Sequence, residues 1–214
     1  MFSLIARAVL FVLALLPPLM AQSHGAGSGK DQLVKGKSEL PVVAVLPFAG
    51  FDSELTKLVV KQIKSDYAVV VKVLAVKPLP QAAYYPPRSR YRAEKLLAYL
   101  EGVAGFQYDK IIGLTHKDIS TSKGEHQDWG ILGLGRMGGS PCVVSTYRLR
   151  ARGADEARFR ERLVRVATHE IGHTFGLPHC PEPECNMRDA MGSILSVDQG
   201  DGRLCVKCKA AVSR

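Results

Sequence analysis

Apolar residues recur along the chain with two spacings, one typical of buried strands and the other of amphipathic helices. Apolar or β-branched runs bounded by proline, glycine or polar residues predict strands at residues 41–48, 68–76, 109–114, 129–137 and 142–148. Apolar positions three or four residues apart predict helices after Ser53, at 93–103 and at 155–175. Polar stretches predict loops at 81–90 and 115–128. Strands that alternate with helices predict an α/β (mixed α+β) fold, a mixed sheet with helices packed on it.

The last predicted helix marks a boundary in the chain. It reaches Gly176, a residue that suits the left-handed end of a helix. The chain beyond this glycine has little periodicity. We therefore expect one domain at residues 41–214, with an upper lobe at 41–176 and a lower lobe at 177–214.

The first residues have the layout of a secretory signal peptide. One positive charge, Arg7, precedes an apolar stretch at residues 8–20, and polar residues follow Ala21. This stretch is shorter than the roughly 20 residues that a transmembrane helix needs, and an uncleaved anchor is the alternative. We expect residues 1–21 to be removed by cleavage after Ala21, and residues 22–40 to form a flexible lead-in. The mature protein would then be secreted or periplasmic, without stable membrane insertion.

Composition and charge add little to this interpretation. The chain has 214 residues, of which 46% are hydrophobic and 23% charged, as in an ordinary soluble globular protein. The formal net charge is +9, and removing the single charge of the leader lowers it to +8. Because the basic residues are dispersed and no aromatic residues are interleaved with them, we expect no nucleic-acid partner.

Candidate chemistry concentrates at residues 169–179, which have the sequence HEIGHTFGLPH. Residues four apart on a helix point in similar directions, so His169 and His173 present their imidazoles to one point. Gly176 can adopt a positive φ, which ends the helix and brings His179 in as a third ligand. Three protein ligands leave the fourth position of a tetrahedral zinc ion open to water, which is typical of a catalytic site.

Glu170 follows the first of these histidines and would lie beside that water. Because zinc lowers the pKa of a bound water toward about 7, Glu170 can take its proton and later pass it to the leaving amine. The alternatives are histidines that bind no metal and a metal site without catalysis.

Four of the five cysteines crowd into the last 35 residues. They are Cys180, Cys185, Cys205 and Cys208. Four thiolates can hold a closed tetrahedral zinc ion, whereas in an oxidising compartment the same residues could form two disulfides in any of three pairings. Cys142 stands alone in an apolar strand, which indicates a buried, inert thiol.

The layout HExxHxxGxxHCx4CxM followed by CxxC, from His169 to Cys208, resembles the archaemetzincin family of the metzincin clan. The resemblance implies a twisted mixed sheet above a cleft, an active-site helix that carries His169, Glu170 and His173, and a small zinc-stapled C-terminal subdomain. It implies a zinc metallopeptidase that acts on peptide or protein substrates. It also implies two zinc ions per chain, a catalytic one on the three histidines and a structural one on the four cysteines.

The same resemblance places two further features. Met187 takes the position of the methionine turn, under the catalytic zinc, and Met191 is the competing candidate. Residues 129–139 take the position of an edge strand that rims the cleft and can pair with an extended peptide. The alternative for this segment is a glycine-rich hairpin that binds no ligand.

Three arginines precede the histidine motif on the last predicted helix. Arg158, Arg162 and Arg165 share a helix face with His169. They could form a funnel for acidic peptides or simply a solvated basic face.

The leading hypothesis is a monomeric zinc metallopeptidase. A catalytically silent, zinc-containing peptide-binding module of the same fold is the alternative, and a disulfide-stapled domain without metal is a third. Glu170 favours the first, because a protein that only binds peptides does not need a carboxylate at that position.

Overall fold

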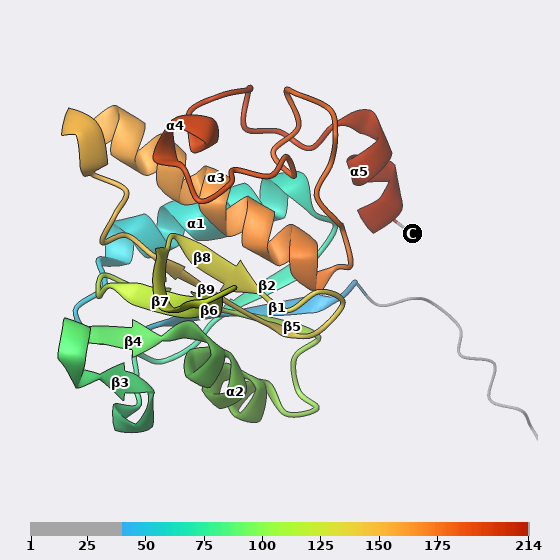
Figure 1. Cartoon of the computed structure of the whole chain (residues 1–214). Coiled ribbons are helices and arrows are strands. Elements are labelled where there is room, and N and C mark those ends of the chain that lie inside the picture. Colours follow the sequence, from blue (N-terminus) through green and yellow to red (C-terminus); the bar gives the residue numbers. More distant parts are fainter. Residues whose placement is uncertain (1–39, 214) are drawn as a thin grey trace, which may run out of the picture. The chain divides into compact units, whose positions relative to one another are not determined.

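The computed structural model describes residues 40–213, so the predicted signal peptide and all but the last residue of the lead-in lie outside the described residues. A five-stranded sheet forms the centre of the described part (Figure 1). From edge to edge its strands are β2 (Val70–Val73), β1 (Val42–Pro47), β5 (Lys110–Thr115), β9 (Pro141–Ser145) and β8 (Gly133–Gly135). The first four are parallel, and β8 is antiparallel to β9.

Helices cover both faces of this sheet. Helices α1 (Ser53–Asp66) and α3 (Glu156–Thr174) lie on one face, and α2 (Ala93–Ala104) lies on the other (Figure 1). The side chains of β1 point alternately to the two faces of the sheet. Val43 and Val45 pack in the apolar core beneath α1 and α3, and Ala44 and Leu46 pack in the core beneath α2. Two apolar layers thus bury the central strands, and the predicted mixed α/β fold is confirmed.

A second, four-stranded sheet corrects the loop predictions. Its strands are β3 (Tyr84–Tyr85), β4 (Arg90–Arg92), β6 (Ile119–Lys123) and β7 (His126–Ile131), in that order. The short 3₁₀ turns Gln81–Ala83 and Pro86–Arg88 flank β3. The prediction of loops at 81–90 and 115–128 is therefore wrong in part. The β6–β7 hairpin is mostly exposed and polar, so it lacks the apolar alternation that marks a half-buried strand.

Two predicted strands also differ from the structure. The single strand expected at 129–137 is two strands in different sheets, since β7 ends at Ile131 and β8 begins at Gly133. The strand expected at 142–148 ends at Ser145, where the chain turns. Leu132 lies between β7 and β8, and its carbonyl accepts a hydrogen bond from the N–H of Ser145.

The chain after Gly176 contains little regular structure, apart from α4 (Ile194–Val197) and α5 (Val206–Val212). A small buried cluster holds it together, formed by Leu177, Cys185, Met187 and Cys208. The expected division into an upper and a lower lobe stays a prediction. None of the helices in residues 40–213 is long and apolar enough to cross a membrane.

Neither expectation for the three arginines describes Arg162 or Arg165, because both side chains are buried, with 3% and 6% exposed. Arg162 donates hydrogen bonds to the carboxylate of Asp198 and to two backbone carbonyls of the turn before α3. Arg165 donates to the carbonyls of Val197 and Gln199. These guanidinium groups fasten the C-terminal segment to α3. A helical face alone does not reveal that a later segment covers it.

Candidate active site

Helix α3 carries the first two histidines and the glutamate of the motif. It begins after Asp155, whose carboxylate caps the N–H of Arg158, and it ends before Gly176, which has a φ of +88°. The predicted helix at 155–175 is therefore confirmed. On its last turns the rings of His169 and His173 lie 4.5 Å apart, centroid to centroid.

His179 returns to these two rings after the turn at Gly176. Its ring centroid lies 5.4 Å from that of His169 and 5.0 Å from that of His173. One nitrogen of each histidine lies within 4.8 Å of the others, so the three can hold one metal ion. His179 is the most exposed of the three, and its Nδ1 lies 3.5 Å from a carboxylate oxygen of Asp189.

Hydrogen bonds fix the tautomers of the two helical histidines. Nδ1 of His169 lies 2.7 Å from the carbonyl oxygen of Asn186, and Nδ1 of His173 lies 2.9 Å from that of Leu177. A carbonyl can only accept, so each Nδ1 carries the proton and each Nε2 has a free lone pair. The two Nε2 atoms nevertheless face each other at 3.0 Å. Two lone pairs repel at this distance unless a cation lies between them, so the donor set fits a metal ion.

Burial keeps these imidazoles neutral. Loss of solvation lowers the pKa of His169 to about 4 and also lowers the pKa of His173, while the hydrogen bonds to Asn186 and Leu177 oppose the shift. Both rings are therefore uncharged at pH 7, which is the form that binds metal.

Glu170 is buried between α3 and the edge strand β8, and loss of solvation raises its pKa to about 8. The backbone N–H of Gly135 donates to its carboxylate and partly opposes this rise. A Cβ atom at Gly133 would lie 2.7 Å from Cγ of Glu170. Gly133 and Gly135 thus leave room for the glutamate. Only the tertiary pairing of β8 with α3 reveals this role.

A cleft of about 410 Å³ lies in front of the three histidines. Strand β8 and α3 form two of its walls, and the segment around Asp189 and Gly192 forms another. Trp129 of β7 reaches across to this segment, where its Nε1 lies 3.5 Å from the position of a Cβ atom on Gly192. The expected edge strand is real, since β8 pairs only with β9 among the described residues.

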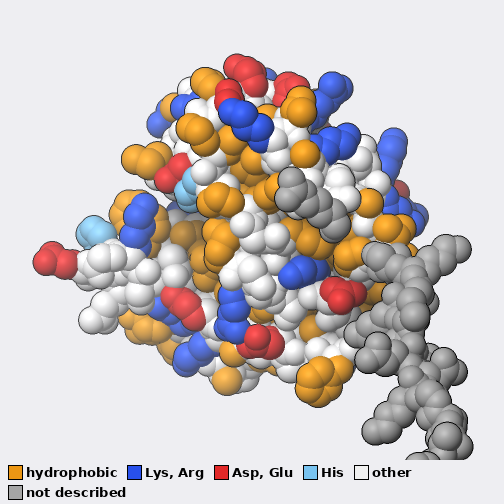
Figure 2. All heavy atoms as spheres, turned by 90° about the vertical axis from the view of Figure 1, so that its right-hand side faces the viewer, with side chains coloured by type: hydrophobic (Ala, Val, Ile, Leu, Met, Phe, Trp, Pro, Cys, Tyr) orange, Lys and Arg blue, Asp and Glu red, His pale blue; other side chains and the backbone are white. Residues whose placement is uncertain are grey.

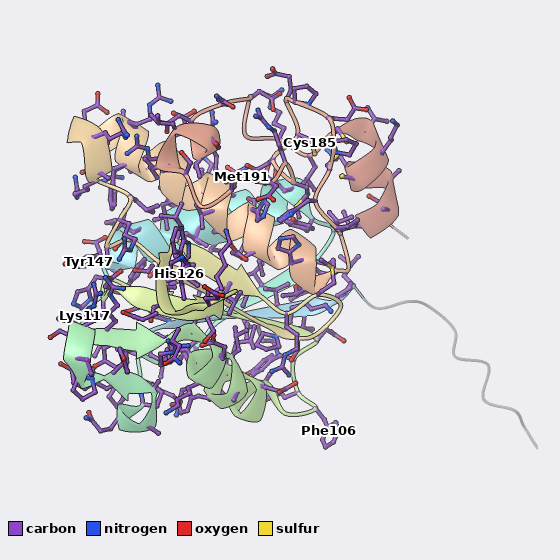
Figure 3. The ribbon with its side chains drawn as sticks, in the orientation of Figure 1. Phe106, Lys117, His126, Tyr147, Cys185 and Met191 are labelled. Carbon is purple, nitrogen blue, oxygen red and sulfur yellow. The ribbon has the colours of Figure 1, made fainter. Side chains whose placement is uncertain are left out.

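The four C-terminal cysteines form a second candidate metal site. Cys185 lies beside α5, the helix that carries Cys208 (Figure 3). The Sγ atoms of Cys180 and Cys205 lie 3.8 Å apart, as do those of Cys185 and Cys208. A tetrahedral ion with Zn–S bonds of about 2.3 Å would space its sulfurs by about 3.8 Å. The sulfur geometry therefore fits a closed zinc site.

The thiol of Cys205 is the one best prepared to lose its proton. Its pKa is lowered to about 7, chiefly by a hydrogen bond from the backbone N–H of Cys208. Cys180 directly follows His179, so the sulfur cluster and the histidine cluster are joined by one peptide bond.

Met187 and Met191 have opposite environments. Met187 is fully buried against Gly172 of α3, the residue before His173. Met191 is 73% exposed, with a φ of +52°. Met187, and not Met191, therefore packs against the histidine helix. The assignment of Met187 to a methionine turn stays a prediction.

Comparison with known proteins agrees with this arrangement. The model of peptidase family M54 matches residues 48–214. An archaemetzincin from Methanopyrus kandleri is 37% identical over 151 residues, which is 70% of this chain and 82% of that protein. An archaemetzincin from Haloquadratum walsbyi is 28% identical over 174 residues, or 78% of this chain and 96% of that protein.

Solved structures give the same result. The crystal structure of the Methanopyrus kandleri archaemetzincin superposes with a TM-score of 0.69 at 34% identity, covering 81% of this chain and 93% of that one. An archaemetzincin from Archaeoglobus fulgidus, complexed with malonate, gives a TM-score of 0.67 at 28% identity and covers 80% and 99%. Fold and matches together define a zinc metallopeptidase. The chain belongs to peptidase family M54, the archaemetzincins, as its motif indicates.

Proposed function

We propose that this protein hydrolyses peptide bonds with His169, His173 and His179 as ligands of a catalytic zinc ion and Glu170 as the general base and acid. The observation that carries the proposal is the pair of facing Nε2 atoms of His169 and His173, 3.0 Å apart, beside the buried carboxyl group of Glu170. When bound, zinc would supply Lewis acidity to the scissile carbonyl and to the attacking water.

The protein's own residues would then handle the substrate and the protons. The outer edge of β8 offers backbone donors and acceptors to an extended peptide. Burial alone raises the pKa of Glu170, but the charge of a cation held by the three histidines would favour its ionised form. Glu170 would then take a proton from the attacking water and deliver it to the nitrogen of the leaving amine. The N–H of Gly135 holds the carboxylate in place for both transfers.

The competing hypothesis is a module of the same fold that binds zinc and peptides but cuts nothing. A peptide library analysed by mass spectrometry separates the two, with Glu170→Gln as the test variant and zinc content measured on each sample. We expect Glu170→Gln to retain zinc and to lose activity by about 10²–10⁴-fold. The matched control is Glu125→Gln, an exposed glutamate of the β6–β7 turn outside the cleft, which should cleave normally. Equal cleavage by both variants would refute the role of Glu170.

We also propose a structural zinc ion on Cys180, Cys185, Cys205 and Cys208, which gives two zinc ions per chain. The 3.8 Å sulfur spacing supports this proposal, because a disulfide needs about 2.05 Å. Metal analysis together with a thiol count under denaturing conditions tests it. Two zinc ions and five thiols are expected, whereas two disulfides would leave one zinc ion and one thiol.

Export is proposed on the sequence of the N-terminus alone, with cleavage after Ala21 and a secreted or periplasmic product. We propose separately that the mature protein is a monomer. Mass spectrometry of the mature protein should show Gln22 as its first residue. Light scattering on a size-exclusion column should give the mass of one chain.

A further inference from the structure

A second apolar groove, of about 700 Å³, lies between α1 and the edge strand β2. It shares no lining residue with the cleft in front of the histidines. Its walls include Phe51 and Val60 on one side and Val73 and Val76 on the other. The groove is therefore separate from the zinc chemistry, and the following proposal does not depend on the proposed function.

Strand β2 leaves one edge unpaired within residues 40–213, because it pairs only with β1 there. The N–H groups of Val70 and Leu74 donate toward β1. Because backbone groups alternate in direction along a strand, those of Val71 and Val73 point to the free edge. This edge also exposes apolar side chains, with 54% of Val73 and 60% of Val76 accessible. Free backbone groups beside exposed valines form a template for another strand.

The charge around the groove has one sign. Lys57, Lys61 and Lys64 lie along one side of α1 and line the groove, and no acidic residue among residues 40–213 does so. Lys57 is paired with Glu54 at 2.8 Å, but Lys61 and Lys64 form no ion pair with any described residue. On the face drawn in Figure 2, basic side chains are scattered among apolar and acidic ones.

We propose that this groove binds an extended peptide segment rich in apolar and acidic residues, which adds to the sheet as a strand beside β2. The peptide's backbone would pair with Val71 and Val73. Alternate residues of a strand point to one face of the sheet, so the side chains on the α1 side would include both the apolar ones that fill the groove and the carboxylates that face Lys61 and Lys64. An anionic acyl chain would satisfy the apolar walls and the lysines, but it would leave the strand edge unpaired. The free edge therefore favours a peptide.

Binding is tested with the full mature chain and a fluorescein-labelled octapeptide amide of the sequence VVEEVVEE, which places both valine and glutamate on each face of an extended strand. Fluorescence polarisation follows the binding. Mass spectrometry confirms that the peptide stays intact. We expect saturable binding that weakens at least tenfold in the double variant Lys61→Glu/Lys64→Glu. The matched control is Lys95→Glu/Lys117→Glu, which changes the net charge equally at exposed lysines outside the groove and should bind normally.

Hydrogen exchange tests the strand pairing. Saturating peptide should slow the exchange of the Val71 and Val73 amides at least tenfold. Binding without this protection would show simple charge attraction and would overturn the proposal. Absence of peptide binding would also overturn the proposal and would show that the lysines only protect the edge from aggregation. Binding of sodium dodecanoate instead of the peptide would overturn it as well. Because peptidase activity does not enter the readout, failure here leaves the proposed function untouched.

Discussion

Gly172 lies directly against the sulfur of Met187, with no room for a side chain between them. Gly172 is the residue before His173 on α3, and Met187 belongs to the segment whose Asn186 carbonyl orients His169. This single contact therefore sets the distance between the helix and the loop that position the candidate metal ligands.

Gly172→Ala should destabilise the protein although alanine favours helices. The gain in helix propensity is about 0.5–1 kcal/mol, whereas overpacking a core costs about 1–3 kcal/mol. We expect a net loss in the free energy of unfolding by urea, together with weaker zinc binding. The control is Gly102→Ala in the last turn of α2, an exposed position where a Cβ meets nothing within 4 Å and should stabilise. Stabilisation by both substitutions would show that the side chain of Met187 moves aside at little cost in free energy.

Gly133→Ala should impair catalysis more than folding. The new methyl group would meet the side chain of Glu170 and displace its carboxylate. We expect kcat to fall at least tenfold while the zinc content is unchanged, because Gly133 contacts Glu170 rather than the histidines. Peptide cleavage and metal analysis on the same sample measure the two effects. An unchanged kcat would show that the position of Glu170 does not depend on Gly133.

Cys142 should resist alkylation in the folded protein. Its side chain is completely buried in β9, and burial raises the pKa of its thiol well above the ordinary value. Iodoacetamide at pH 8 should leave Cys142 unmodified in native protein and modify it fully in urea. Peptide mapping by mass spectrometry distinguishes it from the other cysteines. Labelling of Cys142 in native protein at a rate close to that in urea would contradict its burial.

Local patterns predicted the parts of the site that depend on local structure. The spacing of His169 and His173, the helix end at Gly176 and the group of four cysteines follow from one helix, one turn and two short segments. The burial of Arg162 could not be predicted in this way, because it depends on Asp198, 36 residues further along the chain.

The β6–β7 hairpin was missed for a related reason. Its strands are polar, and long-range ion pairs support it: Asp118, just before β6, binds Arg90 of β4 and Arg148 after β9. Such partners are distant in sequence, and hydrophobic periodicity carries no information about them. The position of Glu170 against β8 was hidden in the same way, because the pairing of that strand is itself a tertiary contact.

The pair of Arg162 and Asp198 should make stability depend on pH in the acid range. The hydrogen bond from Arg162 lowers the pKa of Asp198 below its ordinary value. A carboxyl group whose folded pKa is depressed stabilises the fold above its unfolded pKa of about 3.9, and this contribution is lost as the pH falls through the folded pKa. Asp198→Asn should therefore reduce the free energy of unfolding by about 2–3 kcal/mol at pH 7, where it leaves a buried guanidinium partly unpaired.

Urea unfolding at pH 7 and at about pH 3 measures the difference between the two proteins. The wild type should lose more stability on acidification than Asp198→Asn, so the difference should shrink at low pH. Arg160→Gln is the control, because Arg160 forms an exposed pair with Glu156 on the same helix and such pairs contribute about 0–1 kcal/mol. A difference that stays constant between the two pH values would show that Asp198 acts through packing rather than through its charge.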